Sequence, residues 1–378
     1  MGRHYLDHAS TSPARPEVVE AMLGWMTGER SADPARVHTE GRVARAAVEE
    51  AREAVAELLG ARPREVVFTS GATEAINAAV WGASRRRAGA MLCAGVEHSA
   101  VRDASRRAGP VVDVPVDRAG RMHAEAVIEA AATAGEVSLV HCQWANHEVG
   151  TTQPVPEVAE AARRAGALVH VDAAAAAGHL PVDFAGSDLD LVSVSAHKLG
   201  GPKGVGALLV RRGLRMDPLL VGGEQERARR AGLENVPGIV GFGAAARALL
   251  AEGRLAAEAE SARRMTERVL DAVPAVPGAS VYGDPAGRVP HIVCLGVEGV
   301  EAEAVVLGLD QAGVAVHSGS ACSSETLEPS PVLEAMGVDA DRSVRVSVGW
   351  STTDDDIDAL VAALPDVVAR LRALRAGG

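Results

Sequence analysis

Short apolar runs rich in β-branched residues alternate with Ala-rich stretches between about residue 45 and residue 212. The apolar runs predict buried strands, and most of the stretches between them, such as Val155–Arg164, have the apolar spacing of helices. The predicted strands are Glu65–Ser70, Ala90–Val96, Val111–Val116, Ser138–Ala145, Ala167–Ala173, Leu189–Ser195 and Gly204–Arg212. This alternation indicates an α/β fold with a mostly parallel sheet covered by helices. Ligands of such sheets bind beyond the carboxyl ends of the strands.

The pattern changes after residue 238. The Ala-rich stretch Ile239–Val273 predicts a long connecting helix, either continuous or interrupted. It is followed by a strand at His291–Val297, a helix at Glu301–Ala312, a strand at Ser343–Val348 and a final helix. We therefore expect a smaller C-terminal α+β domain.

Composition narrows the classes of function. The 378 residues are enough for two or three domains, and the formal net charge of -12 argues against nucleic-acid binding through overall charge. The arginine runs at 85–87 and 227–230 fit solvated faces better than a nucleic-acid site. The N-terminus lacks an apolar signal-peptide core, and no uninterrupted apolar run approaches the roughly 20 residues of a membrane helix. We expect a cytoplasmic protein that binds neither nucleic acid nor a membrane directly.

The four cysteines match neither a CxxC pair nor a zinc pattern, so no metal is expected. Cys93, Cys142 and Cys294 lie in apolar runs, which predicts buried and unreactive thiols. Cys322 lies instead among small polar residues of the segment 317–324, which predicts an accessible loop. Accessibility is one requirement of a reactive cysteine.

Two charged residues follow predicted strands of the sheet. Lys198 stands between a strand and a Gly-rich turn, where partial burial would make its amine available for Schiff-base chemistry, although a plain surface lysine has the same pattern. Asp172 ends the strand that should neighbour the lysine strand. A buried carboxylate needs a cationic partner, and the protonated pyridine nitrogen of pyridoxal phosphate (PLP) is one candidate. A helix N-cap aspartate is the alternative.

Two further segments fit the same ligand. The segment 68–74 reads as a strand, a turn at Gly71 and a helix start at Ala72 and Thr73, an arrangement that directs free backbone N–H groups at an anion such as phosphate. His98 follows another strand, where its imidazole could stack on a planar ring and carry protons. An ordinary capped helix and an ordinary loop histidine remain the alternatives.

Taken together and in this order, the segments resemble the class V aminotransferase family of fold-type I PLP enzymes, and more closely its group I, NifS-like cysteine desulfurases. The resemblance spans nearly the whole chain. Its most specific parts are Ser195–Lys198, Ala145–Gly150, Ser318–Cys322 with Leu327–Ser330, and Val344–Gly349.

The resemblance implies a role for each matched residue. Lys198 would bind PLP covalently, Asp172 would pair with the pyridine nitrogen, and His98 would stack on the ring and assist proton transfer. The implied phosphate ligands are Gly71, Ala72, Thr73, Ser195 and His197. Asn146 would lie beside cofactor and substrate, Arg345 would hold the substrate carboxylate, and Cys322 would be the catalytic nucleophile.

The family also implies an architecture and an activity. Residues 14–252 would form a large PLP-binding domain, and residues 1–13 with 253–378 a small domain carrying the cysteine loop, in a homodimer. The implied reaction converts L-cysteine to L-alanine and leaves a persulfide on Cys322 for a sulfur-acceptor or scaffold protein. Alternatives are a selenocysteine lyase, another class V PLP enzyme, or a non-catalytic protein that kept the fold.

Four positions depart from the family pattern. Ala175 replaces a Gln that donates to the phenolic oxygen of PLP, and Leu233 replaces a Thr that reaches the phosphate of the partner subunit. Trp350 stands where many relatives carry Arg, and Asp33 replaces a common Asn. The missing Gln predicts a shifted pKa of the aldimine between Lys198 and PLP, and the missing Thr predicts either weaker retention of PLP or another donor in its place.

Overall fold

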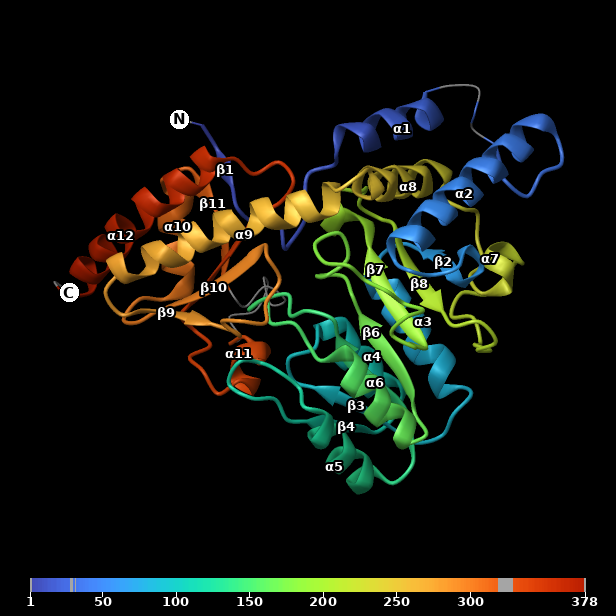
Figure 1. Cartoon of the computed structure of the whole chain (residues 1–378), viewed down its shortest axis with the longest axis horizontal. Helices are drawn as coiled ribbons and strands as arrows, with labels where there is room; N and C mark the ends of the chain where they lie inside the picture. The colour runs from blue at the N-terminus through green and yellow to red at the C-terminus, as the bar shows by residue number, and fades with distance from the viewer. Residues whose placement is uncertain (1, 28–29, 31, 319–328, 377–378) are drawn as a thin grey trace.

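The computed structural model describes residues 2–27, 30, 32–318 and 329–376 (Figure 1). A seven-stranded sheet, here called the large sheet, has the order β2-β8-β7-β6-β5-β3-β4. Its strands are β2 (Val66–Thr69), β3 (Ala90–Ala94), β4 (Val111–Val114), β5 (Val137–Gln143), β6 (Leu168–Asp172), β7 (Leu191–Ser195) and β8 (Gly206–Val210). All seven predicted strands are therefore confirmed. The sheet is mostly parallel, as expected, with β8 antiparallel to both β2 and β7.

Helices cover both faces of the large sheet. One face packs against α3 (Ala72–Ser84) and α4 (Ser99–Ala108). The other face packs against α2 (Thr39–Leu58), α5 (Ala124–Ala134), α6 (Val155–Arg164) and α8 (Val236–Leu250), and α1 (Pro16–Met26) lies against α8. The loop after β8 carries the short α7 (Gln225–Ala228). Two helix layers explain why the central strands are apolar on both faces.

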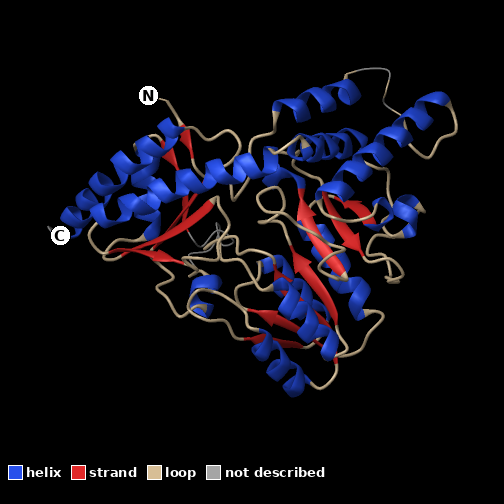
Figure 2. Ribbon diagram, viewed as in Figure 1, coloured by secondary structure: helices blue, strands red, loops and turns tan. Residues whose placement is uncertain are grey.

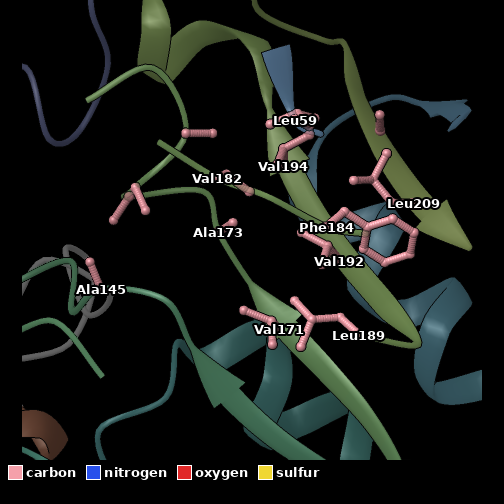
Figure 3. Close-up of a cluster of buried hydrophobic side chains, with 14 of the residues drawn as sticks. Leu59, Ala145, Val171, Ala173, Val182, Phe184, Leu189, Val192, Val194 and Leu209 are labelled. Atoms are coloured by element: carbon pink, nitrogen blue, oxygen red, sulfur yellow. The ribbon is translucent and has the colours of Figure 1, made fainter. Parts of the chain in front are cut away.

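Alternation along each strand assigns its residues to the two faces. Val192 and Val194 of β7 and Leu209 of β8 lie in the core beside Phe184 (Figure 3). Each such fully buried side chain contributes about 1.5–3 kcal/mol relative to exposure. The intervening positions of the strands point to the opposite face, toward α3 and α4.

A second, four-stranded antiparallel sheet, here called the small sheet, has the order β12-β13-β10-β9 (Figure 2). Its strands are β9 (Ala279–Tyr282), β10 (Ile292–Val297), β12 (His317–Ser318) and β13 (Ser343–Ser347). A separate core joins it to α9 (Arg254–Ala272), α10 (Ala302–Gln311) and α12 (Asp354–Ala376). The remaining short helix there is α11 (Pro331–Ala335). The predicted C-terminal strands and helices are confirmed, whereas β9 was missed because it is a short, half-exposed edge strand.

The connecting stretch is two helices rather than one. Between α8 and α9, Gly253 adopts a left-handed φ of 71° and precedes the first residue of α9. Figure 1 shows α9 running from the small-sheet side of the molecule toward α8. The N-terminal segment also reaches the small-sheet side, because β1 (His4–Tyr5) pairs in parallel with β11 (Val314–Ala315). The N-terminal segment thus packs with the C-terminal part of the chain on the small-sheet side.

Candidate active site

A cavity of about 500 Å³ lies where the carboxyl ends of β6 and β7 approach the small sheet and the N-terminal segment. The structure brings together nine of the residues expected at the site. These lining residues are Gly71, Ala72, Thr73, His98, Asp172, Ser195, His197, Lys198 and Arg345. The volume falls within the range of about 300–1,000 Å³ that is typical of cofactor pockets.

Lys198 is placed by a tight turn at the end of β7. The strand ends at Ser195, and a 3-10 helix (Ala196–Leu199) follows directly. Gly200 ends this helix with a φ of 82°, and a Cβ there would lie 2.7 Å from Arg15 Cγ, so the turn requires glycine. The half-buried Lys198 lines the cavity, and its Nζ donates a hydrogen bond to the Ala9 carbonyl oxygen.

Lysine usage in this chain supports the importance of the position. Lys and Arg together number 38, and the printed sequence contains lysine only at Lys198 and Lys203. Both lysines line the same cavity. In a chain that uses arginine for nearly every other cation, lysine is kept where a compact amine faces the cavity. This signal was available in the sequence and identifies Lys203, which motif reasoning missed.

Asp172 is the last residue of β6 and is 8% exposed. Its Oδ1 accepts hydrogen bonds from the Ala174 N–H (3.0 Å) and from the Ser193 hydroxyl (3.4 Å). Strand register places Asp172 opposite Gln143 on β5 and Ser193 on β7. The carboxylate is thus held within the sheet and lines the cavity, where a cation could pair with it.

The N-terminus of α3 forms the wall of the cavity that is best suited to an anion. Gly71 is its N-cap with a φ of 155°, and a Cβ at Gly71 would meet Ser195 Oγ at 4.0 Å. The N–H groups of Ala72 and Thr73 lie in the first helical turn, where a helix provides no acceptors of its own. With the neighbouring hydroxyl of Ser195, this end of the helix suits a phosphate.

Two histidine side chains, those of His98 and His197, also line the cavity. His98 caps α4, since its Nδ1 accepts the Ala100 N–H at 3.1 Å, and its ring packs edge-to-face on His147 with centroids 5.1 Å apart. His197 Nδ1 lies 3.2 Å from Thr11 Oγ1. Burial, with the nearby charge of Lys198, lowers the pKa of His197 to about 4, so it is neutral at physiological pH. His147 lines the cavity but received no role from the motif.

Arg345 enters the cavity from β13 of the small sheet and is 1% exposed. Its Nη1 donates to the His147 carbonyl oxygen (2.9 Å), and its Nη2 donates to Asp7 Oδ1 (2.8 Å) and Ser10 Oγ (2.7 Å). Its Nε has no hydrogen-bond partner among the residues that the structure describes. The guanidinium is therefore oriented by the N-terminal segment.

Asn146 has a different position from the other candidates. It is fully buried, and its amide group bonds to the chain around it: Nδ2 donates to the Val96 carbonyl oxygen, while Oδ1 accepts from the N–H groups of Glu148 and Val149. Asn146 is not among the lining residues, although its neighbours Ala145 and His147 are. In this structure it shapes the turn after β5, and contact with a ligand stays a prediction.

The cysteines divide as expected where the structure describes them. Cys93, Cys142 and Cys294 are buried, and burial raises the pKa of each thiol. These three predictions of buried, unreactive thiols agree with the structure. Cys322 lies outside the described residues.

The family departures also have clear locations. Ala175 lines the cavity and offers no side-chain donor, whereas Leu233 is 65% exposed beside a second pocket with Ser70 and Gly204. Trp350 donates from Nε1 to the Pro13 carbonyl oxygen (2.9 Å). Asp33 accepts the Ala35 N–H (2.8 Å) in a local turn.

Comparisons with known proteins agree with this geometry. The sequence profile of the family described as Aminotransferase class-V matches residues 4–360. The chain belongs to this family. It is 43% identical to a protein of Cereibacter sphaeroides named cysteine desulfurase, over 99% of this chain and 98% of that one. It is also 40% identical to "Cysteine desulfurase IscS 1" of Archaeoglobus fulgidus, over 98% of each chain.

Solved structures give the same fold. A protein titled NifS-like matches with a TM-score of 0.90 and 30% identity, over 98% of this chain and 100% of that one. A structure titled "SspA in complex with cysteine" matches with a TM-score of 0.80 and 29% identity, over 91% of this chain and 98% of that one. The fold expected from the resemblance is thus confirmed.

Metal-ligand clusters and membrane-spanning helices are both absent from the described part of the chain. No group of His, Cys, Asp and Glu side chains there could hold a metal ion. No helix in the same part is long and apolar enough to cross a membrane.

Proposed function

We propose that this chain is a PLP-dependent cysteine desulfurase that converts L-cysteine to L-alanine and carries the sulfur as a persulfide on Cys322. One observation carries the proposal: a lysine amine, a buried carboxylate and a helix N-terminus surround one cavity, and an arginine faces them from the second sheet. The relatives named cysteine desulfurase support the reaction. The similar structure that was solved with cysteine supports the substrate.

The donor set fits PLP. The N-terminus of α3, with Gly71, Thr73, Ser195 and His197, would hold the phosphate. Asp172 would pair with the protonated pyridine nitrogen, and the Lys198 amine would bond to the aldehyde carbon. Bound PLP supplies an electron sink for the α-carbon of an amino acid.

The protein residues have separate tasks in this proposal. Arg345 binds the carboxylate of the substrate through its guanidinium and orients the α-carbon. The substrate amino group would replace the Lys198 amine on the cofactor, and the freed Lys198 amine would then remove the α-proton. His98 packs against the ring and assists proton transfer.

The sulfur step belongs to Cys322. Its thiolate attacks the substrate sulfur, so that an S–S bond forms and the bond between the substrate β-carbon and sulfur breaks. The electron pair of the broken bond stays with the carbon product, which takes up protons and leaves as alanine. The persulfide then passes to a sulfur-acceptor protein.

The core that joins the small sheet to α9, α10 and α12 is separate from the two cores on the faces of the large sheet, which supports a division into two domains. The proposed large domain comprises residues 14–252, and the proposed small domain comprises residues 1–13 and 253–378. We propose a homodimer of this unit, by analogy with the family.

The test uses purified protein with PLP and L-cysteine, and measures alanine and protein persulfide. Cys322→Ala should keep the PLP absorbance and lose persulfide formation. Cys93→Ala is the matched control, because it removes a thiol that is buried and does not line the cavity. Release of sulfide from cysteine by Cys322→Ala at the native rate would show that the sulfur step is wrong.

A further inference from the structure

A row of polar side chains lies inside the large sheet, on the face covered by α3 and α4. His141, His170 and Ser193 are each fully buried. Register places His141 opposite His170 on the neighbouring strand, and places Ser193 opposite Asp172. Such a row is unusual in a sheet whose other inward positions are apolar, because each buried polar group needs a partner.

The partners form one continuous chain of hydrogen bonds. The Oγ of Ser105, a residue of α4, lies 3.0 Å from His141 Nε2. His141 Nδ1 lies 3.0 Å from His170 Nδ1. His170 Nε2 lies 3.2 Å from Ser193 Oγ, and Ser193 Oγ lies 3.4 Å from Asp172 Oδ1. These four buried groups therefore connect the middle of α4 to the carboxylate that faces the cavity.

Both imidazoles are neutral. Burial lowers the pKa of His170 to about 4, against a smaller opposing effect of Asp172. Burial also lowers the pKa of His141 well below its ordinary value, and His170 adds to that effect. A neutral imidazole donates through one nitrogen and accepts through the other, so the chain has a direction.

The bond between the two Nδ1 atoms holds a single proton, so the chain can run in two directions. In the first, the Ser193 hydroxyl donates to Asp172, His170 Nε2–H donates to Ser193 and His141 Nδ1–H donates to His170. The Ser105 hydroxyl then donates to His141 Nε2. In the second direction the three bonds made by the imidazoles are reversed, and the Ser193 hydroxyl donates to His170, so Asp172 loses its hydrogen bond from Ser193.

The two directions have different costs at their ends. The first places the Ser193 hydroxyl proton toward a carboxylate that can only accept, whereas the second leaves the Ser193 oxygen facing the carboxylate oxygen at 3.4 Å with no proton between them. The second lets the Ser105 hydroxyl keep its 2.7 Å bond to the Val101 carbonyl oxygen, a neutral acceptor within the helix. The charged end therefore favours the first direction.

We propose that Ser105, His141, His170 and Ser193 form a directional hydrogen-bond relay that turns the Ser193 hydroxyl toward Asp172 and so positions this carboxylate for its cationic partner. They are positioning residues: Ser193 bonds directly to Asp172, and the other three act through Ser193. The consequence for cofactor binding rests on the proposed function. The direction of the relay does not, because it is a property of the protein alone.

The first test reads the direction in the protein without added PLP. ¹⁵N chemical shifts of the imidazoles, assigned among the twelve histidines with single variants, report the tautomer of each ring. We expect His141 as the Nδ1–H tautomer and His170 as the Nε2–H tautomer, both unchanged between pH 5.5 and pH 8. The opposite pair of tautomers, or protonation of either ring in this range, would overturn the relay.

The second test measures the dissociation constant of PLP. His141→Leu removes a relay member that does not line the cavity, and we expect binding to weaken by about fivefold, a typical effect of one lost hydrogen bond. His141→Gln should restore most of the affinity, because its amide can donate to His170. Cys142→Ala is the control: the next residue on β5 is equally buried but packs in the core on the other face of the sheet.

The possible outcomes distinguish the positioning role of the relay from the proposed function of the enzyme. A folded His141→Leu with unchanged PLP affinity contradicts the positioning role, whatever reaction the enzyme performs. If His141→Leu does not fold, the same measurement is made on Ser193→Ala, which removes the hydroxyl. Ser193→Thr then serves as the matched variant that keeps the hydroxyl. Expected tautomers in a protein that does not act on cysteine would uphold the relay and reject the proposed function.

Discussion

The cavity has two walls that are built in different ways. On the large-sheet wall, Asp172 and Lys198 follow neighbouring strands, and strand register sets their separation. On the opposite wall, Arg345 projects from the small sheet, and its orientation depends on Asp7 and Ser10 of the N-terminal segment. Hydrogen-bond register fixes the first wall locally, whereas packing between distant chain segments fixes the second.

The N-terminal segment connects these walls. The Ala9 carbonyl oxygen accepts from Lys198 Nζ, and the Ala9 N–H donates to Ser347 Oγ of β13 at 2.8 Å. Its next neighbour, Ser10, bonds to Arg345 at 2.7 Å. The proposed cofactor ligands nevertheless lie on the large-sheet wall and Arg345 lies on the other, so changes on the first wall should affect the cofactor and changes on the second should affect the substrate.

Lys198→Ala should have the largest effect. It removes the proposed covalent attachment and proton carrier together, and we expect alanine formation to fall by roughly a thousandfold. After borohydride reduction and proteolysis, mass spectrometry should find PLP on the peptide of Lys198 in the wild type. Lys203→Arg is the control, as it alters the second lysine of the same cavity. Reduced PLP on Lys203 in the wild type would contradict the assignment.

Arg345→Lys should act on the substrate alone. A lysine ammonium cannot reproduce the two-point geometry of a guanidinium, so the KM for cysteine should rise by roughly 10- to 100-fold. The PLP absorbance and affinity should stay as in the wild type. Steady-state kinetics and a PLP titration measure both quantities. Loss of PLP from this variant would show that the two walls are not separable.

Glu97→Gln tests how a buried carboxyl group behind the large-sheet wall makes the stability of the protein depend on pH. Glu97 Oε1 accepts the Gln143 N–H at 2.7 Å, while Oε2 is buried and, within the described ranges, without a partner. Burial, with the charge of Asp172, raises the pKa of Glu97 from 4.5 to about 8. The folded state then binds more protons than the unfolded state between these values, so stability falls as the pH rises.

The expected slope from this one group is about 1 kcal/mol per pH unit. Urea unfolding at pH 5, 6, 7 and 8 should show a flatter decline in the free energy of unfolding for Glu97→Gln than for the wild type. Exposed Glu129→Gln should keep the wild-type slope. An equal slope in Glu97→Gln would mean that Glu97 is already ionised throughout this range.

Ala175→Gln should have the smallest effect. It places an amide donor at a position that lines the cavity, where the family pattern implies a Gln that donates to PLP. We expect PLP to dissociate several-fold more slowly, in line with one added hydrogen bond of about 1 kcal/mol. Absorbance during dialysis measures the rate. Faster loss would mean that the larger side chain does not fit beside the ring.

The sequence predicted the elements of the large sheet well because each strand is a short apolar run bounded by turn residues. It could not predict that β8 is antiparallel, since an apolar run has no direction. It also missed β9, whose residues alternate weakly at an exposed edge. The break at Gly253 was left open because charged and Ala-rich residues continue on both sides of it.

The candidate site was likewise predicted from the sequence only in part. Motifs selected nine residues that line the cavity. Eight of them follow from one rule, because groups at the carboxyl ends of parallel strands converge on one edge, whereas Arg345 comes from the small sheet. The predicted contact of Asn146 with a ligand stays a prediction, since its amide bonds to the Val96 carbonyl oxygen and to the backbone of its own turn. The motifs overlooked His141, because a histidine in an apolar strand gives no sign of what lies opposite it.

By itself the sequence determined the order of strands and helices and the chemical groups at the strand ends. Both follow from local properties: apolar periodicity, turn residues, and a lysine kept in a chain of arginines. The tertiary structure alone decided which groups meet. Arg345 reaches Asp7 across 338 positions of sequence, and His141 reaches Asp172 through His170 and Ser193. Such contacts depend on strand order and on sheet-to-sheet packing, which bring together residues that no local pattern relates.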